Sequence, residues 1–113
     1  MISLQHLPAG ATIVSVQISR VTAATVPALK AAIAAVIASG HHRLIIDMEG
    51  VSFLDSSGLG AMVGLLKLVG SRGDVVVCSL QPSVDQMFRL TRMDKVFRIF
   101  HDADAAGASL EQV

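Results

Sequence analysis

The 113-residue chain is predicted to fold as a single α/β domain, with a mixed sheet of about four to five strands and helices packed on it. Two short apolar runs, Arg43–Met48 and Asp74–Leu80, are typical of strands buried on both faces. Stretches with helical spacing separate and follow them. Neither internal repeats nor a linker-like segment interrupts this order. We therefore expect residues 1–113 to form one compact unit.

The other expected strands are short and rich in apolar or β-branched residues. Thr12–Ile18 is largely β-branched, which favours an extended backbone. Residues 2–7 form a possible edge strand that ends at Pro8-Ala9-Gly10. Val96–Phe100 alternates between apolar and other residues, as a last strand would.

The expected helices are marked by their starts and stops. In the first, Ala28–Ser39, Thr25 is a plausible N-cap, Pro27 lies in the first turn and Gly40 ends the helix. The segment Ser83–Gln86 has the form of a capping box. The later helices are expected at about Ser57–Val69, from this capping box through about Leu90, and at Asp102–Gln112.

Composition and charge exclude several classes of function. Hydrophobic residues make up 52% of the chain and charged residues only 16%, so part of the surface is expected to be apolar and covered by a partner. Nine basic residues balance nine acidic ones, which gives no reason to expect binding to nucleic acid or to an anionic membrane. The longest charge-poor region, residues 21–37, contains Lys30 and Pro27 and is not expected to span a membrane. A cytoplasmic location is expected by default because no signal-like segment begins the chain.

The motif Phe53-Leu54-Asp55-Ser56-Ser57-Gly58-Leu59-Gly60 places an acid and two hydroxyls between a strand-like and a helix-like run. A helix start leaves its first N–H groups without partners and carries partial positive charge. Ser56 and Ser57 could cap these groups, and the same groups would hold a phosphate. The segment is therefore either an Asp/Ser helix cap, with Gly58 easing the turn, or a site of covalent switching.

Glycine content and charge distinguish the helix that follows. Gly58, Gly60 and Gly64 stand where a stable helix would favour alanine, which suggests close approach by backbone or by a partner. The chain has no charged residue between Asp55 and Lys67, so the outer face of this helix is expected to be apolar.

Catalytic and cofactor sites are not expected. The nucleophile-elbow pattern is absent around Ser56, and the glycines match no phosphate-binding loop, so no cofactor is predicted. His41-His42 is interpreted as a solvated turn and not as a metal site. Cys78 lies in a strand-like run and is expected to be a core residue. An enzyme that uses Ser57 or Cys78 is therefore the least favoured class.

A basic stretch near the end of the chain is interleaved with phenylalanines. This pattern would fit nucleic-acid binding, but the balanced net charge favours a solvated face over core aromatics. A local basic patch for a protein partner is left open. The residues are Arg89, Arg92, Lys95 and Arg98, with Phe88, Phe97 and Phe100.

The Phe53–Gly60 motif resembles the STAS family, specifically bacterial anti-sigma factor antagonists. The resemblance continues in Leu44–Met48 and in Val75–Val84, and it covers essentially the whole chain. It implies that Ser56 is phosphorylated by a partner that is both anti-sigma factor and serine kinase. It also implies that the unmodified protein binds that partner and frees a sigma factor, and that a serine phosphatase restores binding. Such a protein is a regulator and not an enzyme.

The resemblance also implies a partner-binding surface around Ser56. Its expected residues are Thr22, Asp55, Ser57, Gly58, Leu59, Gly60, Met62 and Val63. A weak homodimer through the apolar helix face is left open.

One segment departs from the family pattern. Many members carry G-E-[L/I]-D after the second strand, where this chain has Ser19-Arg20-Val21-Thr22. Thr22 stands at the aspartate position and Arg20 in place of the acid. The alternative function is therefore a STAS scaffold that is not phosphorylated, in a stress-sensing or lipid-transport assembly.

Overall fold

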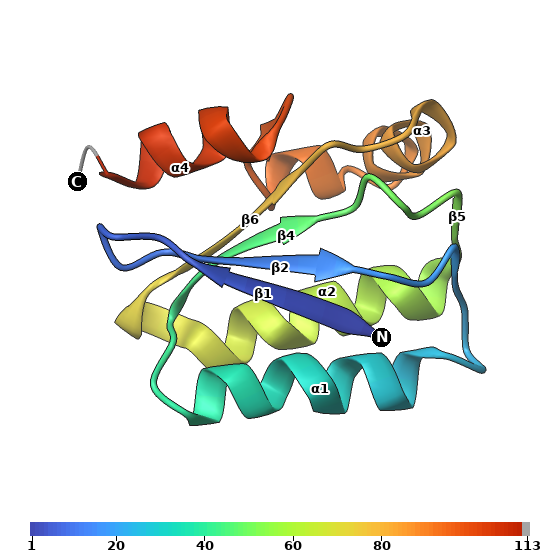
Figure 1. Ribbon diagram of the computed structural model, residues 1–113. Helices are drawn as coiled ribbons and strands as arrows, with labels where there is room; N and C mark the ends of the chain where they lie inside the picture. The colour runs from blue at the N-terminus through green and yellow to red at the C-terminus, as the bar shows by residue number, and fades with distance from the viewer. Residues whose placement is uncertain (112–113) are drawn as a thin grey trace.

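The computed structural model describes residues 1–111, and the predicted helices and strands occur in it in the predicted order (Figure 1). Gln112, the predicted end of the last helix, and the end of the predicted domain at residue 113 lie outside this range. The elements are β1 (Ile2–His6), β2 (Thr12–Val16), β3 (Arg20–Val21), α1 (Val26–Ala38), β4 (Arg43–Asp47), β5 (Phe53–Leu54), α2 (Ser56–Val69), β6 (Asp74–Cys78), α3 (Pro82–Leu90), β7 (Ile99–Phe100) and α4 (Ala103–Glu111).

The main sheet is mixed and has five strands in the order β1-β2-β4-β6-β7. The edge strand β1 is antiparallel to β2, whereas β2, β4, β6 and β7 run parallel to their neighbours. In the central strand β4, Leu44, Ile45 and Ile46 are all inaccessible to solvent. Such burial on both faces is what a parallel strand between two helical layers requires. The predicted fold class is therefore confirmed.

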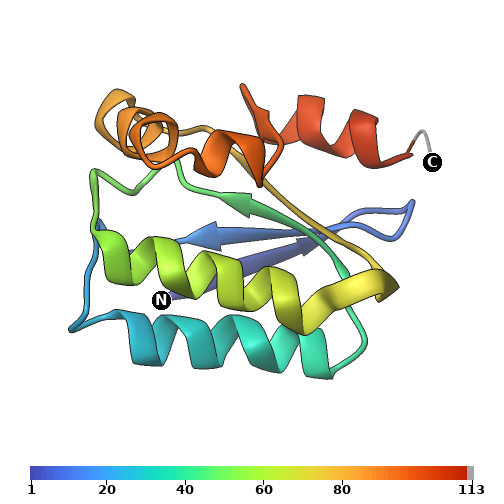
Figure 2. The same cartoon turned by 180° about the vertical axis from the view of Figure 1, so that it is seen from behind.

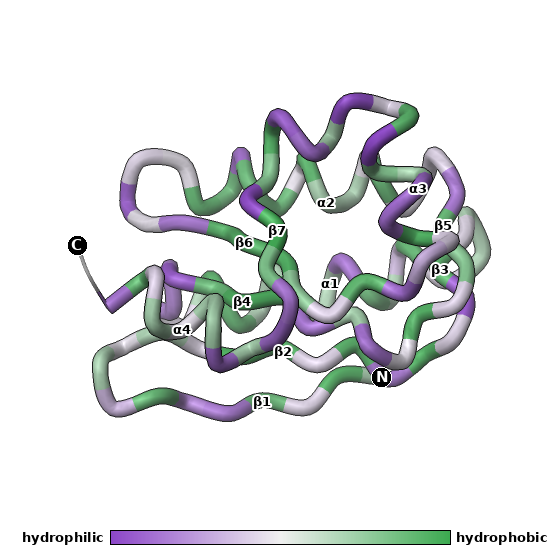
Figure 3. The backbone as a smooth tube through the Cα atoms, turned by 90° about the horizontal axis from the view of Figure 1, so that it is seen from above, coloured by the Kyte–Doolittle hydropathy of each residue, from purple (hydrophilic) through white to green (hydrophobic). Residues whose placement is uncertain are grey.

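Helices cover both faces of this sheet. Leu44 and Ile46 belong to the core cluster with α1 and α2, and Ile45 belongs to the cluster with α4, because successive side chains of a strand point to opposite faces. Helices α1 and α2 lie side by side on one face, and α4 lies across the other (Figures 1 and 2). Hydrophobic stretches of β4 and β6 run through the middle of the molecule (Figure 3).

The predicted strand over residues 96–100 is wrong in length, since only Ile99 and Phe100 pair with β6. A 3-10 turn at Met93–Lys95 precedes it, and Phe97 turns into the core. There its ring meets that of Phe88 edge-on, with the centroids 6.1 Å apart. Core packing of the aromatic ring therefore overrides the alternating pattern.

The predicted capping box at Ser83 is also wrong. Helix α3 begins at Pro82, Gln81 occupies the N-cap position, and no side chain caps the helix. Ser83 Oγ instead donates a hydrogen bond to the carbonyl of Ser52 at 2.8 Å. This bond ties the start of α3 to the segment that leads into β5.

A second, two-stranded sheet was not predicted. Strands β3 and β5 pair in parallel, with Arg20 opposite Phe53 and Val21 opposite Leu54. Val21 and Leu54 are each 2% exposed and join the core under α1 and α2. The pair lies at the end of the molecule where β2 and β4 finish, next to the start of α2 (Figure 1).

Two glycines test how tightly the backbones pack. A Cβ on Gly73 would lie 1.9 Å from the carbonyl oxygen of His42, so Gly73→Ala should lower the free energy of unfolding by roughly 1–3 kcal/mol. The matched control is Gly60→Ala, where a Cβ meets nothing within 4 Å. Gly60→Ala reduces the backbone freedom of the unfolded chain at an exposed helical position. It should therefore stabilise the protein by roughly 0.5–1 kcal/mol. Urea unfolding followed by circular dichroism measures the free energy of unfolding of both variants. A Gly73→Ala protein as stable as Gly60→Ala would contradict the close packing at Gly73.

Candidate functional site

The Asp55–Ser57 segment joins β5 to α2 at one end of the molecule (Figure 1). Ser56 is the first residue of α2 and is exposed, whereas Ser57 is half-buried. Neither serine hydroxyl makes a hydrogen bond within residues 1–111. The first two backbone N–H groups of the helix, those of Ser56 and Ser57, likewise find no acceptor within that range.

Asp55 caps α2, which agrees with the Asp part of the Asp/Ser cap interpretation, whereas the capping expected of Ser56 and Ser57 is wrong. Its backbone is extended, and its Oδ1 accepts a hydrogen bond from the N–H of Gly58 at 3.1 Å. Its carbonyl accepts from the N–H of Leu59 at 3.1 Å. A carboxylate at this position also complements the positive end of the helix. The cap therefore uses neither serine hydroxyl, and it leaves the N–H groups of Ser56 and Ser57 without an acceptor within residues 1–111.

The same carboxylate reaches a second loop. Asp55 Oδ2 accepts a hydrogen bond from the N–H of Ala23 at 3.3 Å, and the N–H of Asp55 donates to the carbonyl of Val21 at 3.1 Å. The parallel pairing of β3 with β5 brings these residues together. Thr22 and Asp55, both predicted as site residues, therefore lie in adjacent loops. The role of Ala23 was missed because a backbone N–H leaves no signal in the sequence.

Thr25 holds the loop after β3 in place. Its Oγ1 accepts a hydrogen bond from the N–H of Thr22 at 2.9 Å and donates to the carbonyl of Arg20 at 3.0 Å. Thr25 occupies the predicted N-cap position of α1, but its side chain does not cap that helix. The side chain of Thr22 remains half-buried at the surface.

Gly58 lets α2 approach the two-stranded sheet. A Cβ at this position would lie 2.4 Å from Leu54 Cδ1 and 3.0 Å from Val21 Cγ1. Because both neighbours are buried, they have little room to move. The close approach predicted from the glycine content is therefore made by the protein's own side chains at Gly58.

The exposed surface beside Ser56 is smaller than the sequence predicts. Gly58 is buried, and Leu59 and Met62 are only 6% and 5% exposed because they face the core. Gly60 is exposed and Val63 is half-buried. The outer surface accessible to a partner is therefore formed by the other predicted residues, Thr22, Asp55, Ser57, Gly60 and Val63, together with Ser56.

A charged side chain of α1 reaches α2. Lys30 Nζ would lie 2.7 Å from a Cβ on Gly64, so the lysine side chain lies against this glycine. The sequence shows no charge between Asp55 and Lys67, but it does not show which side chains of α1 lie over α2. A charged side chain of α1 therefore covers α2 at Gly64, on the side of the helix that faces α1.

Within residues 1–111, no histidine side chain is hydrogen-bonded to Ser56. His6 and His41 stack with their ring centroids 4.5 Å apart, and Nδ1 of each lies within hydrogen-bond distance of Thr12 Oγ1. Thr12 begins β2, at the end of the sheet away from β5 (Figure 1). Within residues 1–111, no three potential ligands cluster as a metal site would require. The same residues include no helix long and apolar enough to cross a bilayer.

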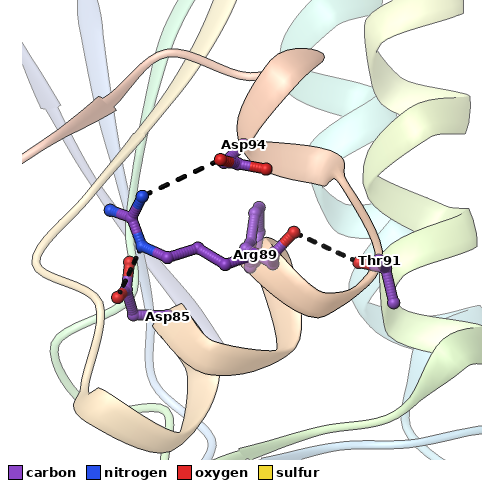
Figure 4. Close-up of polar contacts among 5 residues, drawn as sticks. Asp85, Arg89, Thr91 and Asp94 are labelled. Atoms are coloured by element: carbon purple, nitrogen blue, oxygen red, sulfur yellow. Dashed lines mark hydrogen bonds and ion pairs between the residues drawn. The ribbon is translucent and has the colours of Figure 1, made fainter.

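Ion pairs and burial account for much of the basic stretch. Arg89 Nε lies 2.9 Å from Asp85 Oδ2, and its Nη1 lies 3.8 Å from Asp94 Oδ2 (Figure 4). Arg98 pairs with Asp74. The rings of Phe88 and Phe97 are buried, so they offer no surface on which a base could stack. This arrangement agrees with a solvated face over core aromatics.

Comparison with known proteins identifies the family. The STAS domain model matches residues 6–106, and the chain therefore belongs to the STAS domain family. An anti-sigma F factor antagonist of Paenibacillus polymyxa is 30% identical over 72 residues, which cover 63% of this chain and 62% of that protein. These findings confirm the predicted resemblance to anti-sigma factor antagonists, which are regulators and not enzymes.

Solved structures of anti-sigma factor antagonists have the same fold as this chain. An anti-sigma factor antagonist from Mycobacterium paratuberculosis superposes with a TM-score of 0.88 at 29% identity, covering 97% of this chain and 92% of that one. SpoIIAA, an anti-sigma factor antagonist in its unphosphorylated form, superposes with a TM-score of 0.81 at 18% identity, covering 100% and 98%. The second likeness is one of fold alone.

Removing the Asp55 carboxylate tests its double role. Asp55→Ala should lower the free energy of unfolding by about 1–2 kcal/mol, because both the helix cap and the bond to Ala23 are lost. Asp55→Asn keeps an acceptor oxygen and an N-cap residue, so its loss should be smaller. Urea unfolding measures both. An Asp55→Ala protein as stable as the wild type would contradict the proposed cap.

Burial predicts an inert thiol at Cys78. The side chain is inaccessible to solvent, and this burial raises the pKa of the thiol to about 11. Ellman's reagent, which reacts with thiolate, should label Cys78 at pH 8 only after unfolding. The Cys78 thiol ionises at a lower pH in the unfolded chain than in the folded protein. The free energy of unfolding should therefore fall as the pH rises from about 9 to 11. Cys78→Ala should lack this part of the decline, and rapid labelling of native protein would contradict the assignment.

Proposed function

We propose that this protein is an anti-sigma factor antagonist that is switched off by phosphorylation of Ser56. The unmodified form binds an anti-sigma factor with serine kinase activity and so releases a sigma factor. The observation that supports this most directly is the exposed Ser56 hydroxyl on the first turn of α2, beside a cap that Asp55 already completes. The relatives named as anti-sigma factor antagonists support the choice of partner.

The local structure can accept a phosphate without unfolding. The N–H groups of Ser56 and Ser57 have no acceptor within residues 1–111, and they lie at the positive end of a 14-residue helix. Such N–H groups are suitable donors for phosphate oxygens. A phosphate on Ser56 would therefore change the surface of the protein while leaving its core intact.

The same phosphate would oppose binding. It adds roughly −1.5 to −2 charges next to the Asp55 carboxylate. The neighbouring surface includes Gly60 and the half-buried Val63, which a partner would have to dehydrate together with the phosphate. A loss of about 3 kcal/mol in binding free energy lowers affinity by more than about a hundredfold. A serine phosphatase would reverse the change, and the cycle would operate in the cytoplasm.

A capture experiment tests the proposal. Wild-type protein immobilised on a resin should retain a serine-kinase anti-sigma factor from a lysate of the native cell, identified by mass spectrometry. With ATP, that kinase should phosphorylate wild type and Ser57→Ala but not Ser56→Ala. Ser57→Ala is the matched control because it removes a neighbouring hydroxyl that is also without a hydrogen bond.

Binding by charge variants separates the two candidate functions. Ser56→Asp should bind the kinase at least about tenfold more weakly than wild type, whereas Ser56→Ala should bind as wild type does. The Arg20 and Thr22 departures favour the alternative, a STAS scaffold that is not phosphorylated. Equal binding of Ser56→Asp and wild type, with no phosphate on Ser56, would establish that alternative and overturn the switch.

A further inference from the structure

The surface beside Ser56 carries a cation held on an aromatic ring. The guanidinium carbon of Arg20 lies 4.3 Å from the centroid of the Phe53 ring. The two residues are opposite each other in the parallel β3–β5 pair, and both are exposed. Their neighbours Val21 and Leu54 point into the core, so Arg20 and Phe53 face outward. Stacking on the ring restricts the guanidinium and leaves its outer face and edges open.

This cation has no acidic partner in the described part of the chain. The ion pairs within residues 1–111 join Arg89 and Arg98 to aspartates elsewhere on the molecule. Asp55, the acid of the neighbouring segment, directs its oxygens to the backbone N–H groups of Gly58 and Ala23. Arg20 therefore presents an uncompensated positive charge to solvent.

Arg20 lies close enough to Ser56 for one partner group to sense both. Phe53 stands opposite Arg20 and precedes Ser56 by three residues. The Cα atoms of Phe53 and Ser56 are therefore separated by at most roughly 11 Å. The Debye length at physiological ionic strength is about 8 Å. This separation is less than about one and a half Debye lengths, so a charge placed between Arg20 and Ser56 would be only partly screened from a phosphate on Ser56.

We propose that the Arg20–Phe53 pair selects a partner with a carboxylate facing this position, and that this carboxylate also senses phosphorylation. This inference rests on the proposed function. Unmodified protein attracts the acidic group through the guanidinium, whose planar donors suit bidentate binding to a carboxylate. Phosphorylation places roughly −1.5 to −2 charges nearby and repels the same group. Arg20 thus determines which partner binds, and Ser56 determines when it binds.

Charge reversal tests the proposal with the purified anti-sigma factor kinase identified by capture. Arg20→Glu should weaken its binding to unphosphorylated protein by about tenfold or more. Arg20→Lys keeps the charge but loses the planar stacked group, and Phe53→Leu loses the ring, so each should weaken binding by about two- to fivefold. Isothermal titration calorimetry measures all three dissociation constants.

Lys67→Glu provides the matched control. It makes the same change in net charge on an exposed residue of α2, eleven residues and roughly 16 Å beyond Ser56. Its dissociation constant should change clearly less than that of Arg20→Glu, because this separation is about twice the Debye length. Thermal unfolding should show that Arg20→Glu melts within about 3 °C of wild type, as expected for an exposed substitution.

A reciprocal substitution identifies the partner group. One Asp→Lys or Glu→Lys change at the kinase interface should restore at least about fivefold of the affinity lost in Arg20→Glu. If Ser56→Asp abolishes binding while Arg20→Glu binds like wild type, the Arg20 inference fails and the phosphorylation switch stands. If no serine-kinase anti-sigma factor binds wild-type protein, the proposed function fails and the inference fails with it.

Discussion

The parallel pairing of β3 with β5 is the constraint on which the candidate site depends. Each strand has only two residues, yet the pair fixes the end of α2 that carries Ser56. Val21 and Leu54 anchor the pair in the core, and Gly58 allows the helix to lie directly against them. Without this contact, the loop after β3 and the Asp55–Ser57 segment would have no fixed relation to each other.

Asp55 links the loop after β3 to the start of α2. Its carboxylate bridges two backbone N–H groups from segments far apart in the sequence, those of Gly58 and Ala23. It thus satisfies the cap of α2 and fastens the neighbouring loop at the same time. Ser56 thus has a defined position at the start of α2, and its exposed hydroxyl makes no hydrogen bond within residues 1–111, which suits the proposed phosphorylation.

Arg20 and Ser56 are proposed to have different roles at the site. Among residues 1–111, no charged side chain is buried, and the ion pairs lie at the surface, where they contribute little to stability. Arg20, without an acidic partner in that range, is available for recognition, whereas Ser56 is available for modification. A phosphate at Ser56 would add roughly −1.5 to −2 charges to this surface without disturbing the hydrophobic core.

The sequence by itself determined the order of the longer elements and the position of Ser56 between a strand and a helix. Runs such as Arg43–Met48 and the D-S-S-G motif are local signals, because strand burial and helix starts depend on residues close in sequence. It did not reveal β3 and β5, since two-residue strands are too short to show periodicity. Only the tertiary structure decided that Asp55 and not a serine caps α2, that Leu59 and Met62 face the core, and that Arg20 stacks on Phe53. These outcomes depend on backbone donors and on packing between distant segments, which no local pattern of side chains encodes.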